Sequence, residues 1–191
     1  MNPTGLTTNS PSPNAGTRYQ ARRMEKPVEE QSPHAQIVEL INRYFVAIDD
    51  KCLDLVLAES TFAPAGKMVR PNGAETIGPA AICAGQNESF ARFRATQHVM
   101  TNHVVDLAGE HARVRANVIA THLWAPGQGD PVALESHFTA GGVMTAEVVR
   151  LERRWRITRL QNRVVWRTGS GFVQMLATGR VRGSEASSDD A

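Results

Sequence analysis

Two histidines and one aspartate are the residues of this sequence whose types and positions best suit chemistry. His98 lies in the apolar run TQHVMTNHVVDL, His122 lies in ANVIATHLW, and Asp49 ends the amphipathic segment INRYFVAIDDK. A neutral imidazole can remove a proton from a carbon next to a carbonyl or from a hydroxyl, while a carboxylate fixes its tautomer and stabilises the imidazolium that forms. The three residues could therefore form a buried acid/base set. Either histidine can be the base, and the other would protonate a leaving hydroxide, a carbonyl oxygen or an epoxide oxygen.

Helical segments are expected in the first half of the chain. Ser32-Pro33 supplies a cap and a first-turn proline, and apolar residues then recur at helical spacing as far as Ile48. A short second helix is expected through residues 53–57, and Gly78-Pro79 opens a third that runs to about residue 93. Between these two, FAPAGKMVRPNGAETIG offers turn residues around brief extended pieces.

The second half of the chain has the two-residue period of β-strands. Strands are expected at residues 96–107, 112–124, 136–152 and 155–167, and turn residues separate them. Helices followed by a meander of long strands predict an α+β fold, in which a curved antiparallel sheet wraps around the N-terminal helices.

Strand alternation assigns the histidines to a face. His122 shares its face with small apolar residues from Val114 to Ala120, which should point to the core. In the preceding strand, alternation puts His98 on one face with Thr96 and Asn102. Asn102 is therefore a candidate to hydrogen-bond a substrate, although a hydrogen bond to a neighbouring strand is an equal alternative.

The ends of the chain differ in composition from the middle. Residues 1–32 are rich in Asn, Pro, Ser, Thr and Gly, which predicts a disordered arm, and residues 183–191 predict a disordered tail for the same reason. One domain is expected at 33–169. The segment 170–182 begins at flexible glycines and continues with apolar residues, so it is expected to form either a lid or a subunit-packing extension.

Several classes of function are disfavoured. The sequence has no run of roughly 20 apolar residues and no secretory signal pattern, so we expect a cytoplasmic protein without a membrane partner. Cys52 and Cys83 lack CxxC spacing, and His98, His103 and His122 lack the spacing of a zinc site, so no metal is expected. The segment RRWRITRLQNRVVWR resembles a nucleic-acid surface, but its arginines alternate with apolar residues as on an ordinary strand. No nucleic-acid partner is therefore expected.

The order of these features resembles a known family. A helix ending in an aspartate, a FAP turn, a GPAAI helix, a TQH strand start, a histidine in the next strand and a final WRI…W pair resemble the SnoaL-like branch of the NTF2-like superfamily, over about residues 34–168. Within that branch, the chain is most similar to the scytalone dehydratase group. The resemblance implies a cone-shaped α+β barrel with a hydrophobic cavity, no metal or organic cofactor, and a homodimer or homotrimer.

The resemblance also implies site residues. Asp49, His98 and His122 match the acid/base residues of the dehydratase group, whereas Ile48 and Arg70 stand where that group has tyrosines, and Met144 stands near the position of a missing asparagine. The residues expected to contact a substrate are Arg70, Asn102, Trp124, Met144 and Trp166.

The implied function is a cofactor-independent dehydratase or cyclase that acts on a hydrophobic oxygenated small molecule, such as a polyketide-type intermediate. The alternative is a noncatalytic NTF2-like accessory subunit or scaffold, which would not need the three acid/base residues.

Overall fold

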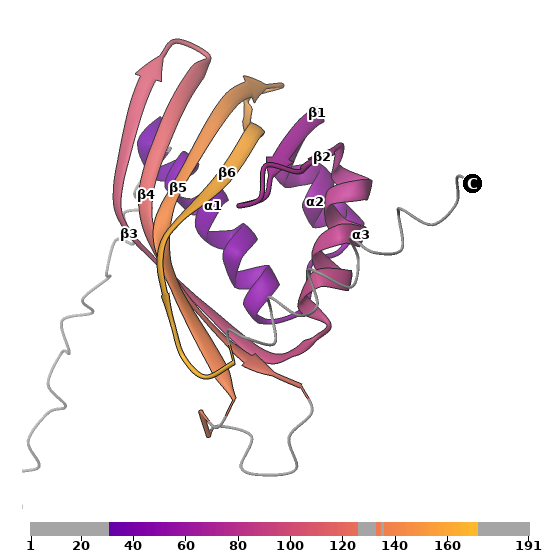
Figure 1. The fold of residues 1–191 in the computed structure, drawn as a ribbon. Coiled ribbons are helices and arrows are strands. Elements are labelled where there is room, and N and C mark those ends of the chain that lie inside the picture. The colour runs from indigo at the N-terminus through magenta and orange to yellow at the C-terminus, as the bar shows by residue number, and fades with distance from the viewer. Residues whose placement is uncertain (1–30, 126–132, 135, 172–191) are drawn as a thin grey trace, which may run out of the picture. The chain divides into compact units, whose positions relative to one another are not determined.

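The computed structural model describes residues 31–125, 133–134 and 136–171. In this part of the chain, three helices lie on one side of a curved six-stranded sheet (Figure 1). None of the described helices is long and apolar enough to cross a membrane. The elements in chain order are α1 (Pro33–Asp49), α2 (Leu55–Thr61), β1 (Phe62–Val69), β2 (Glu75–Ile77), α3 (Pro79–Phe90), β3 (Phe93–Ala108), β4 (His111–Trp124), β5 (His137–Leu151) and β6 (Arg154–Thr168).

The predicted α+β class is confirmed, and every predicted helix and long strand is present. The predicted arm falls almost entirely outside the described residues, as do the predicted tail and all but the first two residues of the predicted segment 170–182. Those assignments remain predictions.

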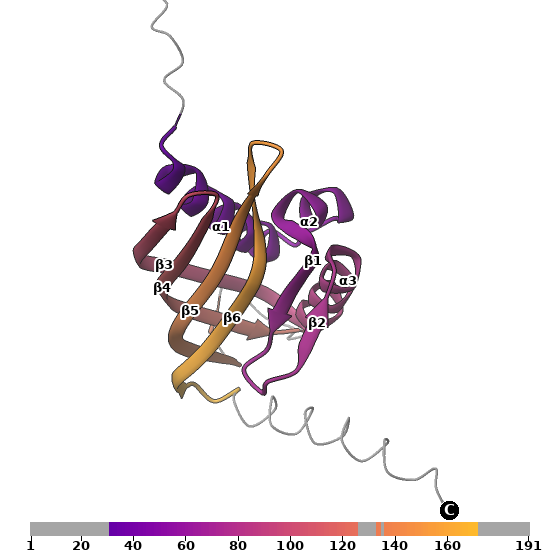
Figure 2. The same ribbon diagram turned by 90° about the horizontal axis from the view of Figure 1, so that it is seen from above.

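The sheet differs from the expected barrel in two respects. Its strand order is β2-β1-β6-β5-β4-β3, so β2 and β3 are its edges and the sheet stays open. The strands from β3 to β6 form the expected antiparallel meander, but β1 runs parallel to β6 and lies beside it (Figure 2). β1 belongs to the helical half of the chain and joins the sheet beside its last strand.

The first helix places an aspartate against the sheet. Ser32 caps α1 through its Oγ, which accepts a hydrogen bond from the backbone N–H of Ala35 at 3.2 Å, and Pro33 fills the first turn. The helix packs mainly against β3 with a buried stripe that includes Ile37 and Ile41. It ends at Asp49, because Lys51 adopts a left-handed backbone with a φ of 55° and turns the chain away.

The core lies between the helices and the inner face of the sheet. On β4 the inner face consists of small and branched residues from Ala112 to Ala120, and on β5 the completely buried Met144 lies opposite Ala116. These short side chains let the helices approach the strands closely. At the end of the sheet near His122, the core side chains are aromatic instead.

A β-bulge in β3 overturns part of the predicted alternation. Thr101 pairs with Asn117 and Val104 pairs with Arg115, so β3 has one more residue than β4 between these pairs. Asn102 occupies the bulge with a φ of 54°. The bulge reverses the faces beyond it. Val104 therefore points outward and is half exposed, whereas an unbroken two-residue period would put it on the same face as His98.

A glycine in β5 permits close pairing with β6. Gly142 lies opposite Val164, and a Cβ added to it would lie 2.4 Å from the backbone oxygen of Arg163. Because the backbone cannot rotate out of the way, we expect Gly142→Ala to lower the free energy of unfolding by about 1–3 kcal/mol. Urea unfolding of the two proteins measures the change, and an unaltered midpoint would contradict the role assigned to this glycine.

Candidate active site

The carboxylate of Asp49 is held by three hydrogen bonds from β3. Its Oδ1 accepts from the Thr96 hydroxyl at 2.8 Å and contacts Nδ1 of His98 at 2.7 Å, while its Oδ2 accepts from the backbone N–H of His98 at 2.7 Å. Partial burial acts to raise the pKa of Asp49, but the hydrogen bonds from His98 and Thr96 outweigh it and hold the pKa below its ordinary value. Asp49 is therefore an ionised acceptor at neutral pH.

This carboxylate selects the tautomer of His98. Only 7 % of the His98 side chain is exposed, and an ionised carboxylate can only accept hydrogen bonds. We therefore assign the proton of the neutral imidazole to Nδ1, which leaves Nε2 free to accept a proton. This geometry suits His98 as a general base, because the neighbouring carboxylate of Asp49 orients the ring and would stabilise the imidazolium.

His122 lies next to His98 in a more apolar environment. Thr96 is its direct partner on β3, and the centroids of the His98 and His122 rings are 5.7 Å apart. The His122 ring stacks on Phe138 with a centroid distance of 4.3 Å, and its Nδ1 is buried without a hydrogen-bond partner among the described residues. Burial, followed by the nearby His98, lowers the pKa of His122 to about 4, so this imidazole is neutral at pH 7.

Aromatic rings enclose the two histidines. Phe45 lies 5.1 Å from His98 between ring centroids, and Phe93 lies 4.9 Å from His122. Phe90 contacts both histidines, at 5.8 Å and 6.0 Å. Groups transferring protons here would do so in a largely apolar environment, where each electrostatic interaction is stronger than in water.

A cleft adjoins this aromatic cluster through Phe90. The cleft has a volume of about 250 Å³ and is lined by Ile48, Lys51, Gln86, Asn87, Phe90 and Ala91. Phe90 thus lines the cleft and also contacts both histidines.

The structure brings the three predicted acid/base residues together, whereas the predicted substrate contacts are distributed differently. Trp124 belongs to the aromatic cluster, with its ring 4.8 Å from Phe93, and its indole N–H donates to the backbone oxygen of Gly171 at 3.0 Å. Met144 is completely buried in the core. The Arg70 guanidinium donates to Ser89 Oγ at 3.1 Å, which ties it to α3. The substrate roles of these residues remain predictions.

Two of the expected substrate contacts lie on the outer face of the sheet, away from the two histidines. Asn102 is exposed in the β3 bulge, and its side-chain oxygen accepts a hydrogen bond from Asn117 at 3.5 Å, because the bulge turns it out of the inner face. Trp166 pairs with Gly141 and covers it on the outer face of the sheet, where its side chain is 47 % exposed. Neither residue can line a hollow on the helix side.

Three further residues belong to the site in ways that the sequence did not predict. The sequence places Thr96 only on the face of His98, and in the structure its hydroxyl donates a hydrogen bond to Asp49. Phe138 stacks on His122, and Phe90 separates the histidines from the cleft. The two-residue period of β5 puts Phe138 on the inner face, but its position opposite His122 depends on the strand register, which a single sequence does not provide.

Comparison with known proteins identifies the family of the chain. A family model described as the SnoaL-like domain matches residues 29–161. The chain belongs to the SnoaL-like family. A search of curated proteins finds no match. The matched range of the SnoaL-like domain contains all three acid/base residues, from the end of α1 to β4.

Solved structures share the fold of this SnoaL-like chain. The crystal structure of a "Putative Scytalone Dehydratase" from Novosphingobium aromaticivorans DSM 12444 is 20% identical with a TM-score of 0.60, covering 71% of this chain and 85% of that one. A hexachlorocyclohexane dehydrochlorinase (LinA) type 2 is 15% identical with a TM-score of 0.60, covering 71% and 86%. An NTF2-like superfamily protein from Salmonella enterica is 19% identical with a TM-score of 0.58, covering 72% and 94%. At these identities the likeness establishes a common fold, and the predicted SnoaL-like family is confirmed by the family match.

The low pKa of His122 has a consequence for stability. A histidine in the unfolded chain takes up a proton near pH 6.5, whereas folded His122 does so near pH 4, so the unfolded state binds more protons between these values. The contribution of His122 to the free energy of unfolding is therefore fully present above about pH 6.5 and is lost as the pH falls towards 4. His122→Phe keeps a flat ring against Phe138 but cannot be protonated. We expect the wild-type protein to lose roughly 3 kcal/mol more than this variant between pH 7 and pH 4.

Urea unfolding of the wild-type protein and His122→Phe at several pH values measures this difference. The other titrating groups are common to both proteins, so they cancel in the comparison. An equal loss of stability in the two proteins would show that folded His122 does not resist protonation.

Proposed function

We propose that the protein is a cofactor-independent dehydratase in which His98 is the base, Asp49 its orienting partner and His122 a hydrogen-bond donor to the substrate. The observation that carries the proposal is the 2.7 Å contact between Asp49 and His98 Nδ1, next to a buried, neutral His122 whose Nδ1 has no partner among the described residues. A buried polar atom without a partner favours a ligand that supplies one.

The geometry supports one sequence of proton transfers. Nε2 of His98 takes the proton from a carbon next to a carbonyl, and the electron pair left on carbon forms the double bond as the hydroxyl on the adjacent carbon departs. The imidazolium of His98, stabilised by Asp49, returns its proton to the departing hydroxide, which leaves as water. Every proton and electron pair is accounted for without a further reactant. A cyclase can use the same base: His98 takes the proton of a hydroxyl as its oxygen adds to the β carbon of an enone, the C=C electron pair moves to the α carbon, and the imidazolium returns the proton there.

His122 has a different role from that of an acid. Because the pKa of His122 is about 4, its imidazole is neutral at pH 7. In this proposal the neutral imidazole donates a hydrogen bond from its N–H. Such a donor polarises the substrate carbonyl and stabilises the enolate oxygen that forms as the carbon loses its proton. The sequence predicts one histidine as a base and the other as an acid. In this proposal His98 is the base and also returns the proton, whereas His122 is a neutral hydrogen-bond donor.

The surroundings of the set favour a substrate class. Phe45, Phe90, Phe93 and Phe138 form apolar walls around the two histidines. We infer a hydrophobic, oxygenated small molecule with a carbonyl and a hydroxyl two carbons away. Two of the proteins with a common fold carry names that describe eliminations, a dehydratase and a dehydrochlorinase, which supports the same class of reaction.

Substitution of the base tests the proposal. With a panel of aryl β-hydroxyketones, we expect the wild-type protein to release water and form the conjugated enone, which is followed by ultraviolet absorbance. His98→Gln and Asp49→Asn should lower turnover by about 10²-fold or more, because the first removes the base and the second removes the carboxylate that orients it. His111→Gln is the matched control, since His111 is exposed on β4. Wild-type turnover in His98→Gln, or no water loss from any member of the panel, would overturn the proposal.

Phe90 provides a separate test of where the substrate enters. Phe90→Ala removes the ring between the cleft and the histidines, so larger ketones should gain access to His98. We expect the ratio of kcat/KM for a large ketone to that for a small one to rise about tenfold. Phe90→Leu, which keeps most of the volume, should change the ratio much less. An unchanged ratio in Phe90→Ala would place the entrance elsewhere.

A further inference from the structure

Thr96 lies between the two histidines of the candidate site. It precedes His98 by two residues on β3, so the two side chains lie on the same face of the strand, and it is the direct cross-strand partner of His122 on β4. Thr96 is also buried, with only 8% of its surface exposed. A buried hydroxyl needs a hydrogen-bond partner, so the partner of Thr96 indicates its role.

The Thr96 hydroxyl gives its proton to Asp49. The two oxygens, Thr96 Oγ1 and Asp49 Oδ1, are 2.8 Å apart, and an ionised carboxylate can only accept a hydrogen bond. A hydroxyl has a single proton, so Thr96 has none left to donate elsewhere. His122, its cross-strand partner, keeps Nδ1 without a hydrogen-bond partner among the described residues. Thr96 therefore serves the Asp49–His98 half of the site and not His122.

One oxygen of Asp49 receives two donors. Oδ1 contacts both the Thr96 hydroxyl and, at 2.7 Å, Nδ1 of His98, whereas Oδ2 accepts the backbone N–H of His98. A carboxylate oxygen has two lone-pair directions, and Thr96 occupies one of them on Oδ1. In the described part of the chain, Thr96 is the one residue besides His98 that hydrogen-bonds this carboxylate. The imidazole is thus left a single direction from which to reach Oδ1.

We propose that Thr96 is a positioning residue of the base: its hydroxyl holds the Asp49 carboxylate in one rotation and confines His98 Nδ1 to the second lone pair of Oδ1. The imidazole ring is rigid, so the direction of Nδ1 also sets that of Nε2, the atom that takes the proton of the substrate. This role rests on the proposed function of His98 as the base. Without the hydroxyl, every contact that holds the carboxylate would come from His98 itself, and the carboxylate and the ring could turn together.

The residue type suits this role. Threonine is branched at Cβ, so its χ1 angle is restricted and the buried hydroxyl keeps its direction. Valine has the same shape without the hydroxyl, and serine has the hydroxyl without the methyl group. Substitution by each of them therefore separates a role of the hydroxyl from a role in packing.

The kinetics of Thr96→Val and Thr96→Ser test the proposal, with the aryl β-hydroxyketones that the wild-type protein converts. We expect Thr96→Val to lower kcat about tenfold and to leave KM nearly unchanged, because the base is misaligned but no substrate contact is lost. Thr96→Ser should stay close to the wild-type protein. A role in packing gives the reverse order, in which valine is tolerated and serine is not.

The pH profile gives a readout that packing does not move. Burial acts to raise the pKa of Asp49, the contacts with His98 lower it, and the Thr96 hydrogen bond lowers it further. Loss of that hydrogen bond lets the carboxylate take up a proton at higher pH, so the acid limb of kcat/KM should move to higher pH in Thr96→Val but not in Thr96→Ser. His122 has a pKa of about 4, so it stays neutral over the rest of the profile in every variant.

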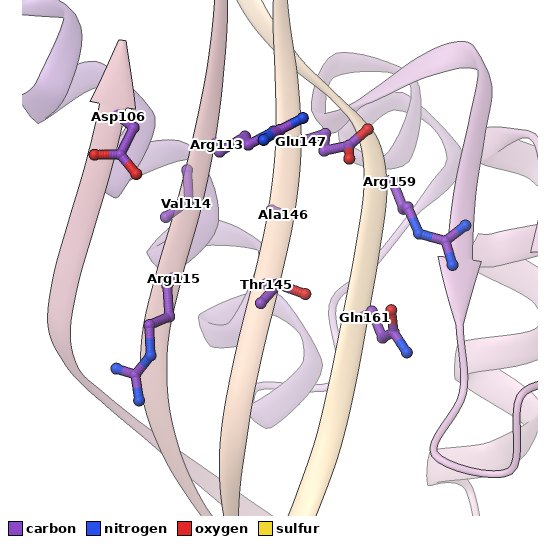
Figure 3. A pocket seen from close by; sticks show the side chains of 9 residues that line it. All are labelled: Asp106, Arg113, Val114, Arg115, Thr145, Ala146, Glu147, Arg159 and Gln161. Carbon is purple, nitrogen blue, oxygen red and sulfur yellow. The ribbon is translucent and has the colours of Figure 1, made fainter.

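Proton NMR follows the His98 ring without turnover. The Nδ1 proton is protected from exchange by Asp49 and should give a signal downfield of the amide protons, which His98→Gln identifies by its loss. This signal should shift or broaden in Thr96→Val and persist in Thr96→Ser. The matched control is Thr145→Val, because Thr145 is exposed on the outer face of β5, in a hollow of about 270 Å³ that Arg115 and Gln161 also line (Figure 3). It should change neither the signal nor the kinetics.

The two measurements distinguish a failure of this proposal from a failure of the proposed function. If the wild-type protein converts no ketone but the Nδ1 signal changes in Thr96→Val, the proposed function is wrong and the positioning of His98 by Thr96 is supported. The positioning role is refuted by an unaltered Nδ1 signal in Thr96→Val, by a wild-type kcat and pH profile in that variant, or by Thr96→Ser that is as slow as Thr96→Val.

Discussion

The hydrogen bonds between Asp49 and β3 fix the geometry on which the candidate site depends. They join the last residue of a helix to the backbone and side chains of a strand, and the turn that follows adds a hydrogen bond from the Lys51 ammonium to the backbone oxygen of Phe93. A partly buried carboxylate without partners costs much free energy. Sliding α1 along β3 would therefore leave a charge unpaired, and the helix is held in one register relative to the sheet.

The two histidines differ because their surroundings differ. His98 has an ionised carboxylate on one side, whereas His122 has a phenylalanine ring stacked on its face and no charged partner in contact among the described residues. One imidazole thus contacts a carboxylate, whereas burial keeps the other neutral at pH 7. Two copies of a single residue type acquire separate roles from burial and one hydrogen bond.

Much of this arrangement could be predicted from sequence, because it depends on periodicity and on caps. The change from a helical period to a period of two located the four long strands, and alternation placed His122 on the inner face. The bulge at Asn102 could not be predicted, because both faces of that segment carry valines and no glycine marks the irregularity. The pairing of β1 with β6 and of Phe138 with His122 depends on contacts distant in sequence, which a local pattern does not encode.

The parallel pairing of β1 with β6 constrains how the chain folds. Phe62–Val69 has only the three-residue strand β2 as a strand partner until Arg154–Thr168 has been made, and the loop closed by the pairing of β1 with β6 contains α3 and the strands β3 to β5. Closing so long a loop is entropically costly, and non-local strand pairing of this kind slows folding. During synthesis on the ribosome, β1 therefore gains its long strand partner only when the end of the domain has been made.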